Sequence, residues 1–169
     1  MYIKILNDTD KAQFDKLLEI TFNNLSDKAF YLPIEEYEAD KLNNRDECII
    51  FGLFNRLSLI GTIVMFLNED NPKGLENLGK SIVLGRLMIL PEYRNKHYAK
   101  HLIKHSINYA ENTYSNDYNN ILITVHPDNI ASYHSFENVG FQKITSATYE
   151  YDNIEYDRDI LIKSIKKGK

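Results

Sequence analysis

The sequence predicts a mixed α/β domain in which helices cover both faces of one largely antiparallel sheet. In several short segments, apolar residues alternate or run unbroken, as is typical of strands. In other segments they recur at intervals of three and four residues, as is typical of helices. The segments follow the order β-α-α-β-β-β-α-β-α-β-β. Because no repeat, low-complexity stretch or linker divides the 169 residues, we expect residues 1–169 to form a single domain.

The chain begins with one predicted strand and two predicted helices. Residues 1–6 alternate between apolar and polar side chains as a strand does. The cluster Asn7-Asp8-Thr9-Asp10 supplies helix N-cap residues, and the helical pattern that follows extends to about Asn24. Pro33 suits the first turn of a second helix.

A hairpin and a further strand are predicted next. The strands Cys48 to Phe54 and Leu57 to Leu67 are separated only by Asn55-Arg56, which indicates a tight antiparallel connection. The segment from Asn68 to Lys80 contains Asn-Pro, Lys-Gly and Leu-Gly pairs and is predicted to be a loop. Ser81 to Leu90 then predicts a third consecutive strand.

The last part of the chain alternates predicted helices and strands. A long helix is expected from Asn95 to about Tyr114. The short apolar run Ile121 to Val125 predicts a strand buried on both faces. A short helix, Ile130 to Asn138, precedes two final strands of about Phe141 to Tyr151 and Tyr156 to Ile165.

Composition excludes several classes of function. The net charge of −4 argues against nucleic-acid binding, which depends on neutralising phosphates with lysine and arginine. No apolar run approaches the ~20 residues of a membrane-spanning helix, and the first residues are too short and too mixed for a signal peptide. We therefore expect a cytoplasmic protein that does not bind membranes.

Neither cysteine nor histidine predicts a metal site. Cys48, the only cysteine, lies in an apolar run, where a buried side chain is expected and no disulfide can form. His97, His101 and His105 recur every four residues, and histidines at this spacing can bind zinc. Because no carboxylate or cysteine is clearly placed to complete the ligand set, we expect an exposed helix face and no metal.

The first candidate site lies where a predicted strand meets the long helix, in the segment Leu87-Met88-Ile89-Leu90-Pro91-Glu92-Tyr93-Arg94-Asn95-Lys96-His97-Tyr98-Ala99. Unpaired amides at a helix N-terminus, together with the helix dipole, readily bind a phosphate or pyrophosphate. Arg94, Lys96 and Lys100 add positive charge at this end, where it disfavours the helix unless an anion is present. A plain turn with solvated charges is the alternative.

The second candidate site follows the buried strand. Val125-His126-Pro127-Asp128-Asn129 ends that strand, and Asn129 can cap the short helix behind it. Gly140 can end this helix, and Phe141 can fill the core. Taken singly, each of these residues has a purely structural explanation.

Together, in this order and at this separation, the two segments resemble the GNAT acyltransferase superfamily. The family's pyrophosphate loop, R/Q-x-x-G-x-G/A, reads Arg94-Asn95-Lys96-His97-Tyr98-Ala99 here, after a matching Leu-x-Ile-x-Pro-x-Tyr. The resemblance covers nearly the whole chain in element order and implies a sheet whose central strands splay apart. It also implies an N-acetyltransferase that passes the acetyl group of acetyl-CoA to an amine of a small molecule or peptide. The family's second motif, N-x-x-A-x-x-F-Y-x-x-x-G-F, is represented by Asn129, Ser132, Ser135, Phe136, Gly140 and Phe141.

The resemblance further implies which residues bind acetyl-CoA. Backbone amides from Asn95 to Ala99 would hold the pyrophosphate, and the main chain around Leu87 and Ile89 would pair with the pantetheine arm. An N–H near Leu87 or Met88 would polarise the thioester carbonyl. The full set expected to bind the cofactor is Leu87, Met88, Ile89, Arg94, Asn95, Lys96, His97, Tyr98, Ala99, Asn129, Ser132 and Phe136.

Departures from the family pattern leave the catalytic residues open. His97 replaces the first glycine of the loop, although its N–H remains. Phe136 stands where many members carry the tyrosine that protonates the thiolate. Tyr133 or Ser135 on the same helix could substitute, or solvent could supply the proton because a thiolate is a good leaving group. Gly85 stands where some members carry a glutamate, so His126 is the best candidate base because histidine changes charge near neutral pH. Glu35 and Glu36 are weaker candidates for this role. Packing beside Pro127 is the alternative role for His126.

The acceptor is not specified by any motif. Tyr31, Glu35 and Glu36 lie in the segment that borders the acceptor cleft in this family, and residues 149–156 also mix aromatic and acidic side chains. Such a lining would attract a cationic amine, while solvation of loops is the alternative. Relatives that pair through their last strands suggest a homodimer. Two other functions are possible for this sequence: a CoA-binding sensor without catalysis, and an interaction protein without a CoA site.

Overall fold

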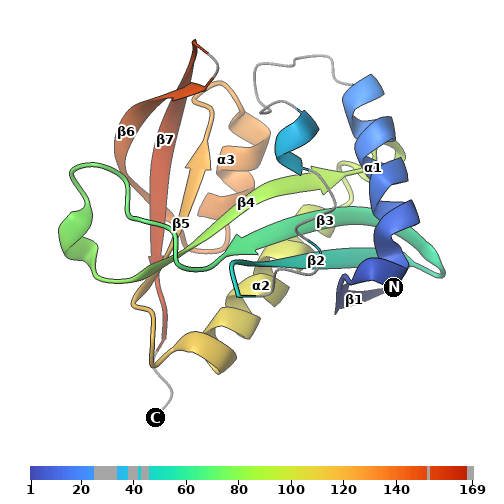
Figure 1. The fold of residues 1–169 in the computed structure, drawn as a ribbon, viewed down its shortest axis with the longest axis horizontal. Coiled ribbons are helices and arrows are strands. Elements are labelled where there is room, and N and C mark those ends of the chain that lie inside the picture. The colour runs from blue at the N-terminus through green and yellow to red at the C-terminus, as the bar shows by residue number, and fades with distance from the viewer. Residues whose placement is uncertain (25–33, 38–41, 43–45, 152, 167–169) are drawn as a thin grey trace.

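The computed structural model describes residues 1–24, 34–37, 42, 46–151 and 153–166. Within these residues, seven strands form one sheet in the order β1-β2-β3-β4-β5-β7-β6 (Figure 1). The strand order confirms the predicted mixed sheet. The strands are β1 (Tyr2–Ile5), β2 (Cys48–Asn55), β3 (Ser58–Phe66), β4 (Ser81–Ile89), β5 (Asn120–Val125), β6 (Gln142–Tyr151) and β7 (Ile154–Ser164).

The sheet is antiparallel except where β4 meets β5. Strands β2 and β3 form the predicted hairpin, and β6 and β7 form a second one. The β4 and β5 strands run parallel, and the long helix between them serves as the crossover. The two parallel strands therefore lie in the middle of the sheet, between one antiparallel group on each side.

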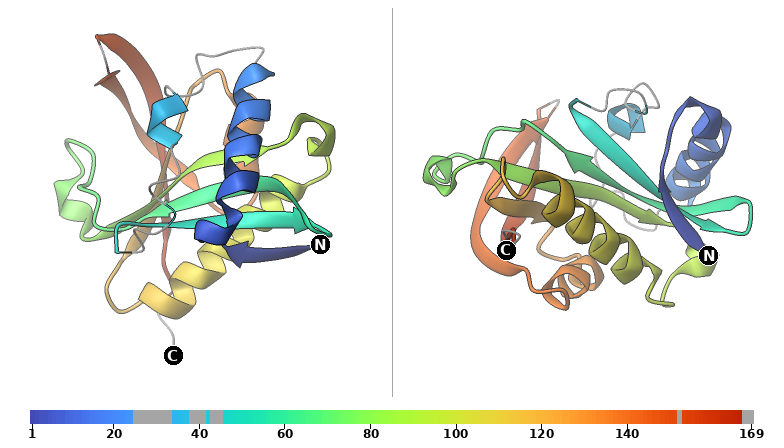
Figure 2. Two further views of the ribbon diagram at one scale, coloured as in Figure 1. Left: turned by 45° about the vertical axis from the view of Figure 1, so that its right-hand side comes forward. Right: turned by 90° about the horizontal axis from the view of Figure 1, so that it is seen from below.

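Helices cover both faces of the sheet, as predicted. The α1 helix (Lys11–Asn23) lies on one face, and α2 (Tyr98–Tyr114) and α3 (Ile130–Glu137) lie on the other (Figure 2). The buried side chains of α2 recur at helical spacing, which orients one stripe toward the sheet. That stripe consists of Leu102, Ile103, Ser106, Ile107 and Ala110.

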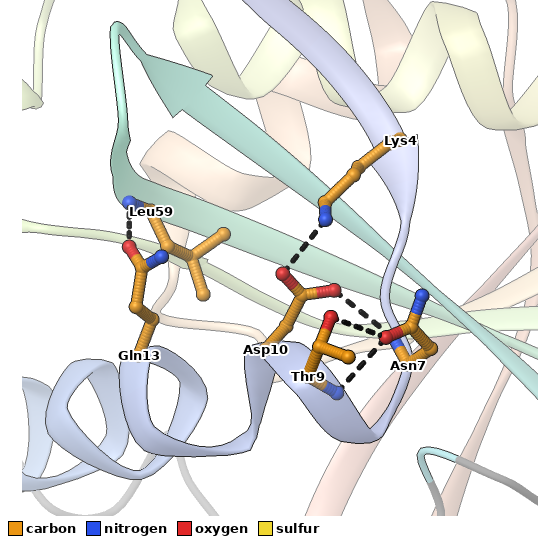
Figure 3. A network of polar contacts seen from close by, with 6 residues as sticks. All are labelled: Lys4, Asn7, Thr9, Asp10, Gln13 and Leu59. Carbon is orange, nitrogen blue, oxygen red and sulfur yellow. Dashed lines mark hydrogen bonds and ion pairs between the residues drawn. The ribbon is translucent and has the colours of Figure 1, made fainter.

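A polar network caps the 3-10 helix η1 (Asp8–Asp10), which leads directly into α1, where the sequence predicted capping residues. The side-chain oxygen of Asn7 accepts from the Thr9 amide at 2.9 Å, and the Asn7 amide donates to the Asp10 carboxylate at 3.1 Å (Figure 3). Asp10 also pairs with Lys4 of β1 at 2.7 Å, and its side chain is 5% exposed. The reciprocal cap satisfies amides at the start of η1, and the Lys4 ion pair ties this turn to the first strand.

The core lies between the helices and the central strands. Among the described residues, the largest fully buried side chains include Phe14 of α1, Phe51 of β2 and Phe141 at the start of the last hairpin. Each such side chain stabilises the fold by about 1.5–3 kcal/mol through removal of apolar surface from water. Cys48 is buried, as predicted.

Two helix predictions need correction. The α2 helix begins at Tyr98, not Asn95, because Asn95 and His97 have left-handed φ values of 60° and 62°, which a right-handed helix excludes. The predicted second helix is a 3-10 helix, η3 (Ile34–Tyr37), within the described residues. Its predicted start at Pro33 and most of its continuation lie outside them. No helix in the described part is long and apolar enough to cross a membrane.

Candidate active site

The parallel strands β4 and β5 separate partway along their length. They pair from Ser81 with Asn120 to Leu84 with Ile123, and beyond this point β4 pairs only with β3. Figure 1 shows the two ribbons diverging in this direction. The divergence is the splay that the family resemblance implied.

A β-bulge in β4 lies at the point of divergence. Thr62 of β3 faces Met88, whereas Val64 faces Gly85, so β4 has two residues where β3 has one. Arg86, within the bulge, has a left-handed φ of 52°. An extra residue at a bulge bends the strand and redirects its side chains. The bulge therefore accounts for the turn of β4 away from β5.

A groove of about 610 Å³ runs between β4, the loop before α2, and α3. We call it the outer groove. Most of the residues that the sequence predicted to bind the cofactor line it, although they come from three elements. Those residues are Leu87, Ile89, Arg94, Asn95, His97, Tyr98, Ala99, Asn129 and Ser132.

The loop before α2 and the first turn of that helix place backbone amides beside this groove. Arg94 Nε donates to the Ile89 carbonyl at 3.1 Å, and Lys96 Nζ donates to the Glu92 carbonyl at 2.9 Å. In the part of the chain that the structure describes, none of the amides from Asn95 to Lys100 donates a hydrogen bond. These amides and the positive end of the α2 dipole favour an anion in the groove.

Three residues of the predicted cofactor set do not line the outer groove. The Met88 side chain is 1% exposed and belongs to the core, so only its main chain could contact a ligand. Lys96 is exposed, and its ammonium is bonded to the loop that carries it. Phe136 is buried and packs edge-on against Phe141, with ring centroids 5.4 Å apart.

A second cavity, of about 80 Å³, lies where the strands diverge. We call it the inner cleft. Leu87, Asn129 and Ser132 line both cavities, so the inner cleft adjoins the outer groove. The Asn129 side chain accepts from the Ser132 amide at 3.2 Å, which confirms its predicted role as the cap of α3. The inner cleft is also lined by Tyr37, Leu84, Gly85, Arg86, Ile123, Thr124, Val125, His126, Phe136 and Arg158.

His126 lines the inner cleft at the carboxyl end of β5. Its Nδ1 accepts a hydrogen bond from the Asp128 amide at 3.1 Å. A neutral ring with this contact carries its proton on Nε2. In this arrangement His126 can polarise an oxygen, and a base role requires the Asp128 contact to break.

Arg158 of β7 and Tyr37 of η3 also line the inner cleft, and neither was among the predicted site residues. Arg158 is 8% exposed and Tyr37 is 6% exposed. Arg158 has the same parity along its strand as the buried Ile160, where strand alternation favours an apolar side chain. A charged residue at an inward position was therefore the signal available in the sequence.

The remaining candidates lie apart from both cavities or outside the described residues. Tyr133 packs against the core and lines neither cavity, and its ring meets His134 edge-on at 6.2 Å. Glu35 and Glu36 belong to η3, directly before Tyr37, and their side chains are not described. Tyr31 lies outside the described residues.

The three histidines spaced four residues apart, at the N-cap of α2 and within it, lie at two different surfaces. His97 lines the outer groove, whereas His101 and His105 line a shallow cavity beside β1. His105 meets Phe51 edge-on at 5.4 Å, and burial lowers the pKa of its imidazole. Among the side chains that the structure describes, no three of His, Cys, Asp and Glu are grouped closely enough to hold a metal ion.

Diverging parallel strands beside a helix N-terminus are the geometry that the resemblance to the GNAT acyltransferases implied. The sequence matches the family described as Acetyltransferase (GNAT) family over residues 12–141. The chain belongs to this GNAT acetyltransferase family. A comparison with curated proteins finds no match.

Solved structures with the same fold share little sequence with this chain. A probable acetyltransferase from Staphylococcus epidermidis is 21% identical with a TM-score of 0.74, and the alignment covers 98% of this chain and 99% of that one. Arabidopsis thaliana NAA60 in complex with acetyl-CoA is 14% identical with a TM-score of 0.77, covering 97% and 98%. A Vibrio cholerae spermidine N-acetyltransferase in complex with CoA and spermine is 19% identical with a TM-score of 0.68, covering 97% and 95%.

Proposed function

We propose that this protein transfers the acetyl group of acetyl-CoA to an amine of a small molecule or peptide. The observation that carries the proposal is the run of backbone amides from Asn95 to Lys100 that donate no hydrogen bond to the described residues, in a segment that lines the outer groove at the start of α2. Such amides bind a diphosphate without needing particular side chains. Membership of the GNAT family and the solved complexes with acetyl-CoA and CoA support the choice of cofactor.

The outer groove binds the cofactor, and the inner cleft holds the reacting groups. Amides of the outer groove hold the diphosphate, and the main chain of β4 guides the thioester toward Leu87, which lines both cavities. The amine nitrogen attacks the thioester carbon, and the carbonyl oxygen becomes an oxyanion. A backbone N–H near Leu87 or Met88 and the Nε2–H of His126 stabilise that charge. Holding the amine beside the thioester supplies much of the remaining rate.

The last step is loss of the thiolate. Collapse of the oxyanion breaks the C–S bond, releases CoA, and leaves the amide product, whose surplus proton passes to solvent. Phe136 has no proton to donate, and Tyr133 lines neither cavity. We propose that solvent protonates the thiolate, which is a good leaving group. The predicted cytoplasmic location and homodimer remain predictions.

Calorimetry and a thiol-release assay test the proposal together. We expect acetyl-CoA to bind and free CoA to appear when the protein is mixed with acetyl-CoA and a panel of amines. Binding without turnover on any amine would favour the CoA sensor. The replacement of a general acid by Phe136 is the feature that agrees with this alternative. Absence of binding to both acetyl-CoA and CoA at millimolar concentration would refute both enzyme and sensor.

A further inference from the structure

The inner cleft contains a buried guanidinium that forms no ion pair with a carboxylate of the described residues. Arg158 lines the cleft and is 8% exposed. Its Nη1 donates to the Asp157 carbonyl at 2.7 Å, and this is its one hydrogen bond to the described residues. The guanidinium also lies over the Tyr156 ring, 5.4 Å from the centroid. Because arginine has five N–H donors, the described residues use only a small part of its donor capacity.

The nearest aspartates are engaged elsewhere. Asp159 pairs with Lys143 at 2.7 Å and accepts from the Ser146 hydroxyl at 2.7 Å. Asp157 accepts from the Thr148 hydroxyl at 2.7 Å. Both aspartates alternate with Arg158 along β7, so their side chains point to the opposite face of the strand. Neither neutralises the guanidinium by direct contact.

Burial of this charge has an electrostatic consequence. Desolvation is the largest influence on Arg158 and lowers the pKa of its guanidinium, whereas Tyr37, Tyr156, Asp157 and Tyr149 act in the opposite direction. A buried charge is costly unless it is paired and hydrogen-bonded. An oxyanion in the inner cleft would supply both the opposite charge and acceptors for the unused donors.

We propose that the acceptor is an amine that also carries a carboxylate or phosphate, and that Arg158 binds this oxyanion. The inference rests on the proposed acetyltransferase function and adds the substrate class. It reverses the expectation of a simple cationic amine, because a polyamine has no group to pair with Arg158 and its positive charge is repelled there. Arg158 is thus a specificity-determining residue that positions the amine beside Leu87.

Matched acceptors isolate the contribution of the oxyanion. Thiol release is measured with α-amino acids and their carboxamides, with β-alanine and its carboxamide, and with O-phosphoethanolamine and ethanolamine. We expect kcat/KM to be about 100-fold higher for the anionic member of the preferred pair, the size of one buried charge-assisted interaction. Preference within the carboxylate or phosphate pairs identifies the oxyanion. Equal or better turnover of the neutral members would overturn the proposal.

Variants of Arg158 separate recognition from folding. R158Q should reduce the anionic-to-neutral ratio to near one, mainly through a higher KM, and R158K should restore part of the ratio because it keeps the charge but loses the planar fork. The control R56Q makes the same change at an exposed arginine of the β2–β3 link. Acetyl-CoA affinity, measured by calorimetry, reports whether each variant is folded. An unchanged ratio in folded R158Q would overturn the proposal.

A binding measurement keeps this proposal distinct from the transferase proposal. In the presence of CoA, N-acetyl amino acids and O-phosphoethanolamine should bind wild type at least about 10-fold more tightly than N-acetyl amino acid amides and ethanolamine, and R158Q should abolish the difference. If acetyl-CoA binds and no amine is acetylated, the transferase proposal is refuted. The binding comparison between anionic and neutral compounds still decides the role of Arg158. Equal binding of anionic and neutral compounds would overturn that role.

Discussion

The outer groove and the inner cleft share Leu87, Asn129 and Ser132 but present different chemistry. The outer groove offers backbone amides at the start of α2, and its loop residues are mostly exposed. The inner cleft offers buried side chains, including Arg158 and Phe136, from β7 and α3. A main-chain site tolerates exchange of side chains, whereas a side-chain site changes its function with each exchange. The features of the outer groove should therefore be common to the family, whereas the side chains of the inner cleft should determine which acceptor this protein binds.

Blocking the groove should produce the largest effect. Ala99 lies in the first turn of α2, where it is half-buried and lines the outer groove. A99W places an indole in the space proposed for the diphosphate, so acetyl-CoA affinity should fall by at least about 100-fold in calorimetry. A12W is the matched control, because Ala12 is exposed on α1 at the other face of the sheet. Unchanged affinity in A99W would place the diphosphate elsewhere.

The groove could be predicted from sequence because it depends on local order. The segment from Arg94 to Ala99 is continuous in the chain, and a strand followed by a turn and a long helix exposes the same amides whatever side chains it carries. Even the error at the start of α2 is local. Asn95 and His97 take left-handed φ values, which asparagine and histidine adopt more often than most residues but which their presence alone does not require.

The cleft could not be predicted in the same way because its side chains meet only in the folded sheet. Tyr37 and Arg158 come from distant parts of the chain and carry no motif. The bulge at Arg86 also depends on how β3 and β4 pair, which single-strand patterns do not give. The position of Phe136 could be predicted from the sequence because it belongs to the same short motif as Asn129. Acceptor specificity therefore depends on tertiary contacts that local patterns leave open.

Changing His126 tests whether the cleft donates or removes a proton. H126A should lower kcat by about 100-fold if the Nε2–H stabilises the oxyanion. H126Q retains an N–H donor but cannot titrate, so it should recover much of the activity and keep the pH dependence of the wild type. Profiles of kcat against pH between pH 6 and about pH 9 check this. Equal losses in both variants, with loss of the acidic limb of the profile, would instead identify His126 as a base.

Adding a proton donor at Phe136 should have a smaller effect of opposite sign. The Phe136 ring lines the inner cleft, and F136Y supplies the hydroxyl that many family members carry. We expect kcat at saturating acetyl-CoA to rise about 10-fold, below the usual ~10²–10⁴-fold of a general acid because a thiolate leaves readily. F141Y is the control, because Phe141 is 1% exposed and lines neither cavity. The hypothesis fails if kcat rises equally in both variants or in neither.

The smallest expected effect distinguishes two neighbouring turns of the groove helix. His97 has a left-handed φ of 62°, where a Cβ is unfavourable, so H97G should stabilise the protein by roughly 0.5–1 kcal/mol and raise Tm by roughly 1–3 °C. His101 is exposed within α2, where the same change should cost roughly 0.3–0.5 kcal/mol and lower Tm. Thermal unfolding of both variants checks the opposite signs. A lower Tm in H97G would mean that the His97 side chain stabilises the loop by more than its backbone conformation costs.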